Sequence, residues 1–518
     1  MSEVDAYFMH NTSSNNRRIA KNTLLLYFRM LLMMAISLYT SRVVLNTLGV
    51  EDFGIYNVVG GIVTMFTFMN GAMASATQRY LTFELGRGDF GRLHKVFCAS
   101  VHIHALISLA IFILAETIGL WFLYTHMTIS VDRLGAALWV YQFAVVSCIV
   151  VLMSVPYNAS IIAHEKMSAF AYISILEVVL KLLIVYMLVW FDFDKLKLYA
   201  VLMFCVQMIS RIAYGRYCSK YFEETRYQWI WDKKLFREMM GFAGWSLFGN
   251  LAAVAFTQGL NILLNMFFGP AVNAARGIAV QVQNAIQGFC ANFQMALNPQ
   301  ITKNYASADL KRMHSLVFAS SKYSFFLLFF LSLPVFIEAE QILTVWLKIV
   351  PAHTANFMRL ILCIIMVDAV ANPLIVSAQA TGKIKAYQAV VGGILLLIVP
   401  VAYLVLKLGG TPESAFVVHF AFVVLAQIAR IWMIRPMIRL SVREYVKEVV
   451  CRIVGVVIFS VILPWIAYEI LAPSLTRFLL IGVTCVISVG IAVYFVGLQR
   501  NERIFMYEKA KQIIHHKL

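Results

Sequence analysis

Amide and hydroxyl side chains recur at helical spacing along two neighbouring apolar segments, residues 240–268 and 274–300. Projected at 100° per residue, each set falls on one helical face, about 100–120° wide. Hydrocarbon offers an amide no hydrogen-bond partner, so these faces must meet protein or water. Their members are Ser246, Asn250, Thr257, Gln258, Asn261 and Asn265 on the first segment, and Arg276, Gln283, Asn284, Gln287, Gln294 and Asn298 on the second.

Two interpretations of these amide faces stay open. Amides inside membrane helices often bond one helix to another, and such a dry contact needs no ligand. Two adjacent faces of this length fit a water-filled cavity better. Amides donate and accept hydrogen bonds together, which suits the hydroxyl groups of a sugar. We therefore expect these faces to bind a polar substrate.

Arginines inside apolar segments are the second signal: Arg29, Arg42, Arg79 and Arg276. An arginine at mid-bilayer costs about 2.5–3.5 kcal/mol on insertion scales, so a retained one usually has a partner or a function. The guanidinium fork matches the oxygens of a phosphate group. The alternative is that the long side chain reaches the lipid head groups, which fits Arg79 best because it lies near the inner boundary. We predict that these four arginines bind substrate.

Acidic residues inside the segments are candidates for ion coupling. Asp368 precedes Pro373 by about one turn, and a proline frees a backbone carbonyl and kinks the helix. Glu116 is a second candidate without such a break. Whether H+ or Na+ is the coupled ion is left open. Glu177 and Lys181 stand four residues apart on one helical face and are predicted to form a structural salt bridge.

Motifs for cofactor or metal chemistry are missing from the sequence. It has no Walker-type loop, no Gly-x-Ser-x-Gly turn and no His-Glu-x-x-His helix, so ATP-driven transport by this chain alone is not expected. The eight cysteines are scattered without a Cys-x-x-Cys pair, and His102 and His104 point to different helical faces. We expect no metal site and no cofactor.

About 14 apolar stretches position these side chains. A bilayer core about 30 Å thick needs roughly 20 apolar residues per helical span. The chain is 61% hydrophobic and 13% charged with a mean hydropathy of +0.78, whereas soluble domains are about 25% charged. It is therefore predicted to be an all-α membrane protein. The expected spans are 22–48, 55–83, 96–124, 134–163, 170–191, 197–219, 240–268, 274–300, 315–337, 355–378, 384–407, 411–434, 450–471 and 474–497.

The formal net charge of +17 gathers in alternate connectors rather than in one basic domain. This asymmetry is the positive-inside pattern, which places both termini in the cytoplasm and argues against nucleic acid as a partner. The polar first twenty residues lack the apolar core of a signal peptide, so the first span is expected to be retained. The basic segments are Arg17–Lys21, Arg87–Lys95, Arg211–Arg237, Lys303–Lys322, Arg430–Arg452 and Arg500–Lys517.

A faint internal repeat pairs the glycine turn at Gly49 with the turn at Gly269-Pro270. Each turn joins an apolar span to a second span rich in small or polar residues. The repeat predicts an N-lobe, residues 1–223, with spans 1–6, and a C-lobe, residues 224–440, with spans 7–12. Residues 441–518 then hold spans 13–14 and a basic tail. Parallel repeats commonly place a substrate path at the lobe interface.

The stretch Leu45–Tyr56, LNTLGVEDFGIY, resembles the first hairpin of Wzx-type oligosaccharide flippases. These proteins belong to the multidrug/oligosaccharidyl-lipid/polysaccharide exporter superfamily. Leu343–Leu347, Phe357–Leu360 and Ala380–Lys383 resemble the segments around spans 9 to 11 of the same family. The resemblance covers essentially the whole chain. It implies two six-helix lobes in a V shape around a central polar cavity, two appended C-terminal helices and alternating access.

The resemblance also implies a cargo, an undecaprenyl-diphosphate-linked oligosaccharide unit moved across a bacterial inner membrane. The glycan would serve O-antigen (lipopolysaccharide), capsule or exopolysaccharide synthesis, with a polymerase and glycosyltransferases as partners beside the membrane lipids. Related lipid II flippases bind the diphosphate with arginines from spans 1, 2 and 8. Those spans hold Arg29 and Arg42, Arg79 and Arg276 here, although they do not align residue for residue. We expect a monomer.

Two other functions compete with this prediction. A cation-coupled multidrug exporter of the same superfamily would depend on Asp368 and favour an acidic cavity, whereas the signals here are basic. A membrane glycan polymerase or ligase would need a large outer loop. The longest outer connector, from Glu338 to Ala355, holds only an amphipathic turn at the membrane interface. We therefore expect a transporter rather than an enzyme.

Overall fold

The computed structural model is helical, and no strand occurs among the residues that it describes. Within those residues, eleven helices are long and apolar enough to cross a membrane. The prediction of an all-α, multi-pass membrane protein is confirmed. The described residues are 22–37, 39–40, 43–44, 47–49, 52, 55–56, 59, 68–126, 130–190, 193–347, 350–472, 474–500 and 502–504.

Three of the predicted spans fall outside those eleven helices. The first is described as a shorter apolar helix, Asn22–Ser37, and the second as helix α2, Phe68–Arg87. The third is α9, Pro270–Ala306, whose 37 residues extend about 55 Å at 1.5 Å per residue. Helix α9 is thus long enough to span, and its amide-rich face is what lowers its hydropathy.

The chain divides into two compact units, called unit 1 (Met1–Leu251 with Thr302–Ala308) and unit 2 (Ala252–Ile301 with Asp309–Leu518). In unit 1, α5 packs along α2, α3 and α7. Side chains of Asp89 and Asp194 cap the first turns of α3 and α7 by accepting backbone N–H bonds, which fixes where these helices begin. Unit 1 contains α2, α3 (Phe90–Leu114), α4 (Leu120–His126), α5 (Val131–Ala163), α6 (Met167–Trp190), α7 (Lys195–Tyr221) and the first part of α8 (Lys233–Phe268).

A π-turn, Ala115–Gly119, joins α3 to α4. The Tyr141 hydroxyl donates a 2.7 Å hydrogen bond to the Ala115 carbonyl, which also accepts the Leu120 backbone N–H. Gly119 is required opposite it, because a Cβ atom at that position would clash with the Tyr141 oxygen. Such single π-turns often occur at functional sites, and this one carries Glu116.

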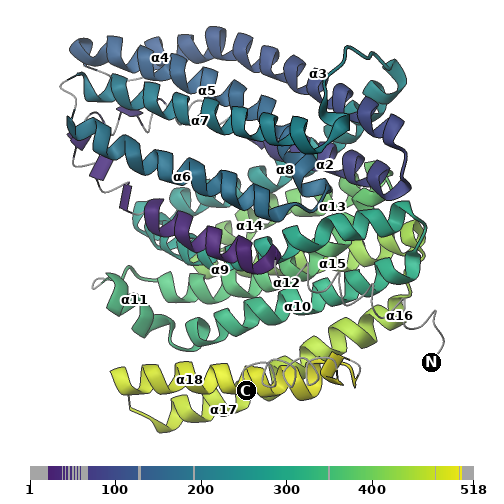
Figure 1. Ribbon diagram of the computed structural model, residues 1–518. Helices are drawn as coiled ribbons and strands as arrows, with labels where there is room; N and C mark the ends of the chain where they lie inside the picture. The colour runs from purple at the N-terminus through teal and green to yellow at the C-terminus, as the bar shows by residue number, and fades with distance from the viewer. Residues whose placement is uncertain are drawn as a thin grey trace, which may run out of the picture. The chain divides into compact units, whose positions relative to one another are not determined.

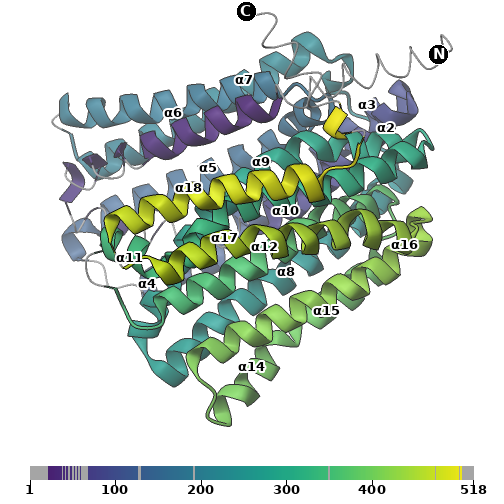
Figure 2. The same cartoon turned by 90° about the horizontal axis from the view of Figure 1, so that it is seen from below.

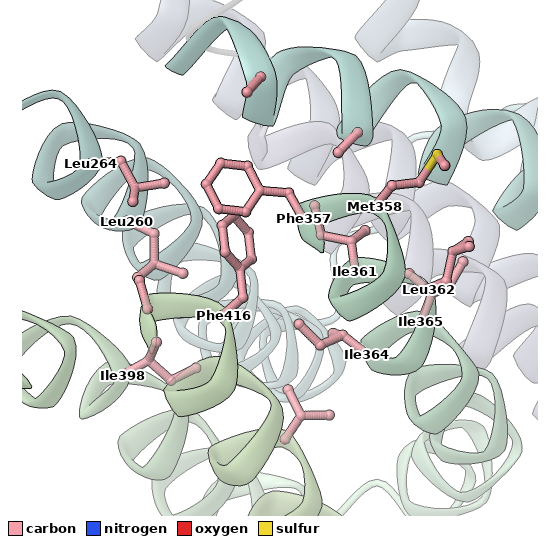
Figure 3. Close-up of a cluster of buried hydrophobic side chains, with 14 of the residues drawn as sticks. Leu260, Leu264, Phe357, Met358, Ile361, Leu362, Ile364, Ile365, Ile398 and Phe416 are labelled. Atoms are coloured by element: carbon pink, nitrogen blue, oxygen red, sulfur yellow. The ribbon is translucent and has the colours of Figure 1, made fainter. Parts of the chain in front are cut away.

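In unit 2, α12 (Thr354–Ala380) lies against α10 (Leu310–Ile337) and α15 (Pro412–Ile438), as Figure 2 shows from below. Their shared core is apolar (Figure 3), and the rings of Phe357 and Phe416 meet at 4.7 Å between centroids. The unit also contains α11 (Ala339–Leu347), α13 (Lys385–Leu396), α14 (Ile398–Lys407), α16 (Val442–Tyr445) and most of α9.

The last two helices, α17 (Cys451–Ile470) and α18 (Leu475–Ala492), lie side by side as a hairpin (Figure 1). This hairpin packs on α10 through an apolar cluster that includes Phe326, Val456 and Ile481. Helices α17 and α18 therefore belong to unit 2 in the structure. The predicted lobe boundaries at residues 223 and 440 stay predictions.

Candidate functional site

Unit 1 encloses a polar cavity of about 370 Å³ between the helix Asn22–Ser37 and α2, α5, α6 and α7. Two residues singled out from the sequence, Arg29 and Glu177, line this cavity. Sequence reasoning missed the other polar lining residues. These are Asn70 and Gln78 from α2, Ser154 and Asn158 from α5, Ser174 from α6, and Gln207, Ser210 and Tyr214 from α7.

Arg29 is oriented by two residues of α6. One terminal guanidinium nitrogen donates a 3.2 Å hydrogen bond to Ser174 Oγ, and the guanidinium carbon lies 4.5 Å from the centroid of the Phe170 ring. The Ser174 hydroxyl in turn donates to the Phe170 carbonyl at 2.8 Å. A cation over an aromatic face is held electrostatically. These contacts position a guanidinium group at the cavity wall.

Glu177 and Lys181 add further charge beside Arg29. Lys181 Nζ lies 2.6 Å from Glu177 Oε1 on the same face of α6. Lys181 itself is outside the cavity lining, in which Arg29 and Glu177 carry opposite charges. The described lining thus holds one guanidinium group and one carboxylate, and the carboxylate is already paired with Lys181.

Three buried acceptor atoms at the cavity have no hydrogen-bond partner among the described residues. They are Asn70 Oδ1, Asn158 Oδ1 and Ser210 Oγ. Leaving a buried polar atom unsatisfied costs about 1–3 kcal/mol, and a polar cavity of this size can hold water or ligand groups that donate to them. The arrangement offers acceptors for hydroxyl groups next to a cation for an anion.

Asn250, from the amide face of α8, belongs to unit 1. A Cβ atom placed on Gly71, which lines the cavity, would lie 3.6 Å from Asn250 Nδ2. Asn250 is also exposed. The structure thus brings Asn250 next to the cavity wall that Arg29 and Glu177 share.

Arg79 lies elsewhere in unit 1, away from the cavity lining. It is 8% exposed, and its guanidinium carbon lies 4.6 Å from the Phe83 ring centroid and 5.7 Å from that of Phe242. Its neighbour Gln78 faces the cavity instead. Arg42 lies outside the described residues.

The amide faces in unit 2 divide into an exposed part and a bonded part. Gln294 is buried, and its Nε2 donates at 2.9 Å both to Ser324 Oγ of α10 and to the Ala369 carbonyl of α12. Asn298 Nδ2 lies 3.5 Å from Asn372 Oδ1. This end of α9 makes the helix–helix bonds that the first interpretation described.

The rest of the two faces is more open. Gln283 Nε2 lies 3.4 Å from Gln287 Oε1 along α9. The exposed members in unit 2 are Thr257, Gln258, Asn265 and Asn284. The second interpretation, a surface available to a polar ligand, fits these residues.

Arg276 of α9 is bound to the amide face of α8. Its terminal nitrogens donate at 3.1 Å to Asn261 Oδ1 and at 3.1 Å to the Thr257 carbonyl. The guanidinium therefore joins the two predicted faces into one polar surface within unit 2. The side chain is partly buried.

The two acids predicted for ion coupling have different surroundings. Asp368 of α12 is within electrostatic range of Arg430 of α15. Arg430 is held by Tyr387 Oη at 2.8 Å and Gln427 Oε1 at 2.6 Å. Glu116, in the π-turn, accepts a 3.2 Å hydrogen bond from Gln142 Nε2. Asp368 thus has an internal cation nearby, whereas Glu116 has a neutral amide.

Comparison with known proteins identifies a family. The sequence profile of the family described as polysaccharide biosynthesis protein matches residues 19–305. No curated protein sequence matches the chain.

The fold is similar to several solved transporter structures. An outward-facing multidrug resistance MATE family transporter of the MOP superfamily aligns at a TM-score of 0.67 and 12% identity, over 82% of this chain and 96% of that one. The MATE transporter ClbM in complex with Rb+ aligns at 0.66 and 16% over 82% and 96%. A MOP superfamily transporter from Pyrococcus furiosus, described by the reverse polarity of its binding pocket, aligns at 0.64 and 14% over 81% and 96%. The resemblance noted in the sequence is confirmed.

Proposed function

Because the chain belongs to the polysaccharide biosynthesis protein family, we propose that it is a flippase for lipid-linked oligosaccharides. Its cargo is an undecaprenyl-diphosphate-linked repeat unit for a surface polysaccharide. The protein lies in a bacterial inner membrane with both termini in the cytoplasm. It acts as a monomer beside a polymerase and glycosyltransferases.

The observation that carries this proposal is the cavity of unit 1. Arg29 supplies a guanidinium group for diphosphate oxygens, and the neighbouring carboxylate of Glu177 is paired with Lys181. The unsatisfied oxygens of Asn70 and Asn158 accept hydrogen bonds from sugar hydroxyls. One cavity thus offers both kinds of contact that a glycan diphosphate needs.

The cavity volume limits what can bind at one time. The cavity volume is about 370 Å³. This space suits a diphosphate with its first sugar rather than a whole repeat unit. In this proposal the exposed amides of α8 and α9 in unit 2, with Arg276, are a separate surface for sugar hydroxyls, and the prenyl tail stays in the lipid. Alternating access then exposes these surfaces to each side of the membrane in turn.

Ion coupling through Asp368 or Glu116 stays a prediction. Asp368 lies near Arg430, so a Na+ ion at this carboxylate competes with a cation that the protein itself supplies. A proton neutralises Asp368 without needing that space. We therefore favour H+ over Na+ at this position.

The competing function is a cation-coupled multidrug exporter with the same fold. The pairing of Glu177 with Lys181 argues against it, because this carboxylate of the described lining is then neutralised and attracts a cationic drug less. This alternative predicts dye export that depends on Asp368 and tolerates loss of Arg29.

The test measures flipping of a fluorescent undecaprenyl-diphosphate oligosaccharide in proteoliposomes, through its protection from an impermeant oxidant. Arg29→Ala should abolish protection, and Arg29→Lys should retain part of it because the charge remains. Arg216→Ala is the matched control, since Arg216 is an exposed arginine on α7 of the same unit. Full activity of Arg29→Ala, in protein that is folded and inserted, would reject the diphosphate role.

A further inference from the structure

The connection between α7 and α8 runs along α3. We call residues Arg226–Asp232 the aromatic linker. The Glu224 carbonyl, just before it, contacts His94 Nδ1 at 2.9 Å, and Tyr227 Oη contacts His102 Nε2 at 2.9 Å. A hydrogen bond joins the Gln228 backbone to Cys98 between them. The connection therefore follows α3 for eight residues, about 12 Å.

The aromatic linker gathers its three rings around one histidine. The chain turns here, since the Ile230 N–H donates to the Gln228 carbonyl at 2.9 Å. The three rings belong to Tyr227, Trp229 and Trp231. Their ring centroids lie 5.6, 4.8 and 5.9 Å from that of His102. The rings nevertheless stay 45%, 77% and 58% exposed. They form an aromatic patch on the surface of unit 1.

The aromatic patch lies where the exposed apolar face of α3 begins. Beyond His102, the same helical face continues with Leu106, Leu109 and Ile113, which are 51%, 56% and 53% exposed. Helix α3 is one of the eleven apolar helices, so this uncovered apolar face belongs in hydrocarbon. Tryptophan and tyrosine collect where hydrocarbon meets the head groups, because each ring has an apolar body and a polar atom.

Basic side chains flank the aromatic patch. Arg226, Lys233, Lys234 and Arg237 are exposed around the linker, and Lys95 is exposed on α3. The acidic Asp232 accepts the Leu235 N–H at 3.0 Å and so caps the start of α8. Each lysine or arginine close to an anionic membrane surface increases the affinity of the protein for that surface about five-fold.

From this arrangement we propose that the aromatic linker is a binding surface for anionic phospholipid head groups. The three rings enter the interface layer, and the flanking cations pair with lipid phosphates. Helix α8 starts at Lys233, directly after the linker. Lipid bound here holds the start of the helix that carries the first amide face. The inference requires only that the helices span a membrane, and it does not depend on the substrate.

The test uses the purified full chain in nanodiscs of phosphatidylcholine with or without phosphatidylglycerol. Trypsin cleaves after Arg226, Lys233 and Lys234, and mass spectrometry gives the rate. We expect phosphatidylglycerol to slow cleavage at least five-fold. The Trp229→Ala/Trp231→Ala variant should lose most of this protection. Trp432→Ala should keep it, because Trp432 is a 74% exposed tryptophan in unit 2.

A second measurement keeps the proposal testable if the alanine variant does not fold. Tryptophan fluorescence is quenched by lipids brominated near the head group or near the chain end. The difference between wild type and Trp229→Phe/Trp231→Phe reports these two rings, and we expect stronger quenching near the head group. Equal cleavage in both nanodisc types would overturn the anionic preference. Absence of quenching, or protection by a soluble oligosaccharide instead of lipid, would overturn the membrane assignment.

Discussion

Replacing Glu502 by glutamine should lower the free energy of unfolding by about 3 kcal/mol. Glu502 follows α18 and binds Lys322 of α10, whose Nζ lies 2.8 and 2.9 Å from the two carboxylate oxygens. The Lys322 side chain is only 3% exposed, whereas that of Glu502 is 24% exposed. The variant removes the negative charge and leaves a buried ammonium group without it.

The magnitude follows from that asymmetry of burial. Breaking a buried ion pair by removing one partner costs about 3–5 kcal/mol, because the remaining charge stays desolvated. Water reaches the Glu502 side of this pair, which places the cost at the lower end. Glutamine keeps an acceptor for the Gln499 N–H, which donates to Glu502 at 2.6 Å. The change therefore isolates the charge.

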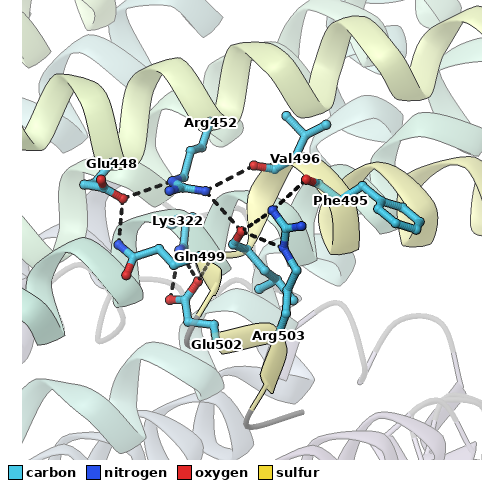
Figure 4. A network of polar contacts seen from close by, with 9 residues as sticks. Lys322, Glu448, Arg452, Phe495, Val496, Gln499, Glu502 and Arg503 are labelled. Atoms are coloured by element: carbon cyan, nitrogen blue, oxygen red, sulfur yellow. Dashed lines mark hydrogen bonds and ion pairs between the residues drawn. The ribbon is translucent and has the colours of Figure 1, made fainter. Parts of the chain in front are cut away.

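The surrounding network explains why the effect is on stability (Figure 4). Arg452 of α17 bonds Glu448 at 3.0 Å and the Leu498 carbonyl at 3.1 Å, and Gln499 Nε2 donates to Glu448 at 2.6 Å. These contacts fasten the residues after α18 to α17, and Lys322–Glu502 fastens them to α10. Loss of one charge weakens a connection among three helices.

The assay is unfolding of the purified protein in detergent, with Glu502→Gln, Lys322→Met and the double variant compared to wild type. The double variant removes both charges and should return to within about 1 kcal/mol of wild type, since an apolar replacement of a buried pair is often neutral. A Glu502→Gln protein as stable as wild type, or a double variant as unstable as the two single losses added, would refute the reasoning.

Three further outcomes are expected in unit 1. Burial alone would raise the pKa of Glu224, but the 2.6 Å contact with His164 more than offsets this effect and lowers the pKa below its ordinary 4.5. The stability that this contact contributes is therefore complete above about pH 4.5 and is lost as the pH falls through the lowered pKa. A series of thermal-unfolding measurements at different pH values checks this. Gly86→Val should destabilise by about 1–3 kcal/mol, because a Cβ atom there would lie 2.8 Å from the backbone of α9 near its end, at Lys303. Gly119→Ala should destabilise through its clash with the Tyr141 hydroxyl, measured in the same unfolding assay.

Each of these outcomes has a control in the same unit. Glu223→Gln changes an exposed neighbour of Glu224 and should leave the acid limb of the pH series unchanged. Gly91→Ala should be tolerated, since its Cβ would meet its nearest atom at 3.7 Å. Tyr141→Phe should relieve Gly119→Ala by removing the clashing oxygen. If Gly119→Ala is equally unstable when combined with Tyr141→Phe, the hydroxyl is not the cause.

The spans were predictable from the sequence because apolar length is a property of a single segment. Helix α9 shows the limit of that signal: its amides lower its hydropathy although its 37 residues are ample to span. The π-turn at Glu116 was not predictable, since it depends on Gly119 meeting Tyr141 from another helix. Arg29 could be identified from the sequence because an arginine inside an apolar segment is unusual by itself, whatever its neighbours.

The cavity itself could not be predicted, because five helices build it together. Asn70, Asn158 and Ser210 are single polar residues on apolar helices, and each by itself is typical of an ordinary helix contact. A weak signal did exist in their spacing. Asn70 and Gln78 lie two turns apart on α2, and Ser210 and Tyr214 one turn apart on α7, so each pair shares a face.

Helical position alone does not distinguish a structural amide from one that faces a ligand, and Gln294 and Asn158 show why. Both are polar residues on long apolar helices, and hydrocarbon would penalise both equally. Gln294 meets a hydroxyl and a carbonyl from α10 and α12, so its Nε2 is satisfied within the protein. The oxygen of Asn158 meets a cavity and no protein donor among the described residues. Among the charged groups, Lys322 is satisfied by Glu502, and Arg29 donates to Ser174 while it lines the cavity. In a membrane helix, a candidate for ligand binding is therefore a side chain with a polar atom that faces an open volume after the neighbouring helices have packed, and Asn158 in unit 1 meets this criterion.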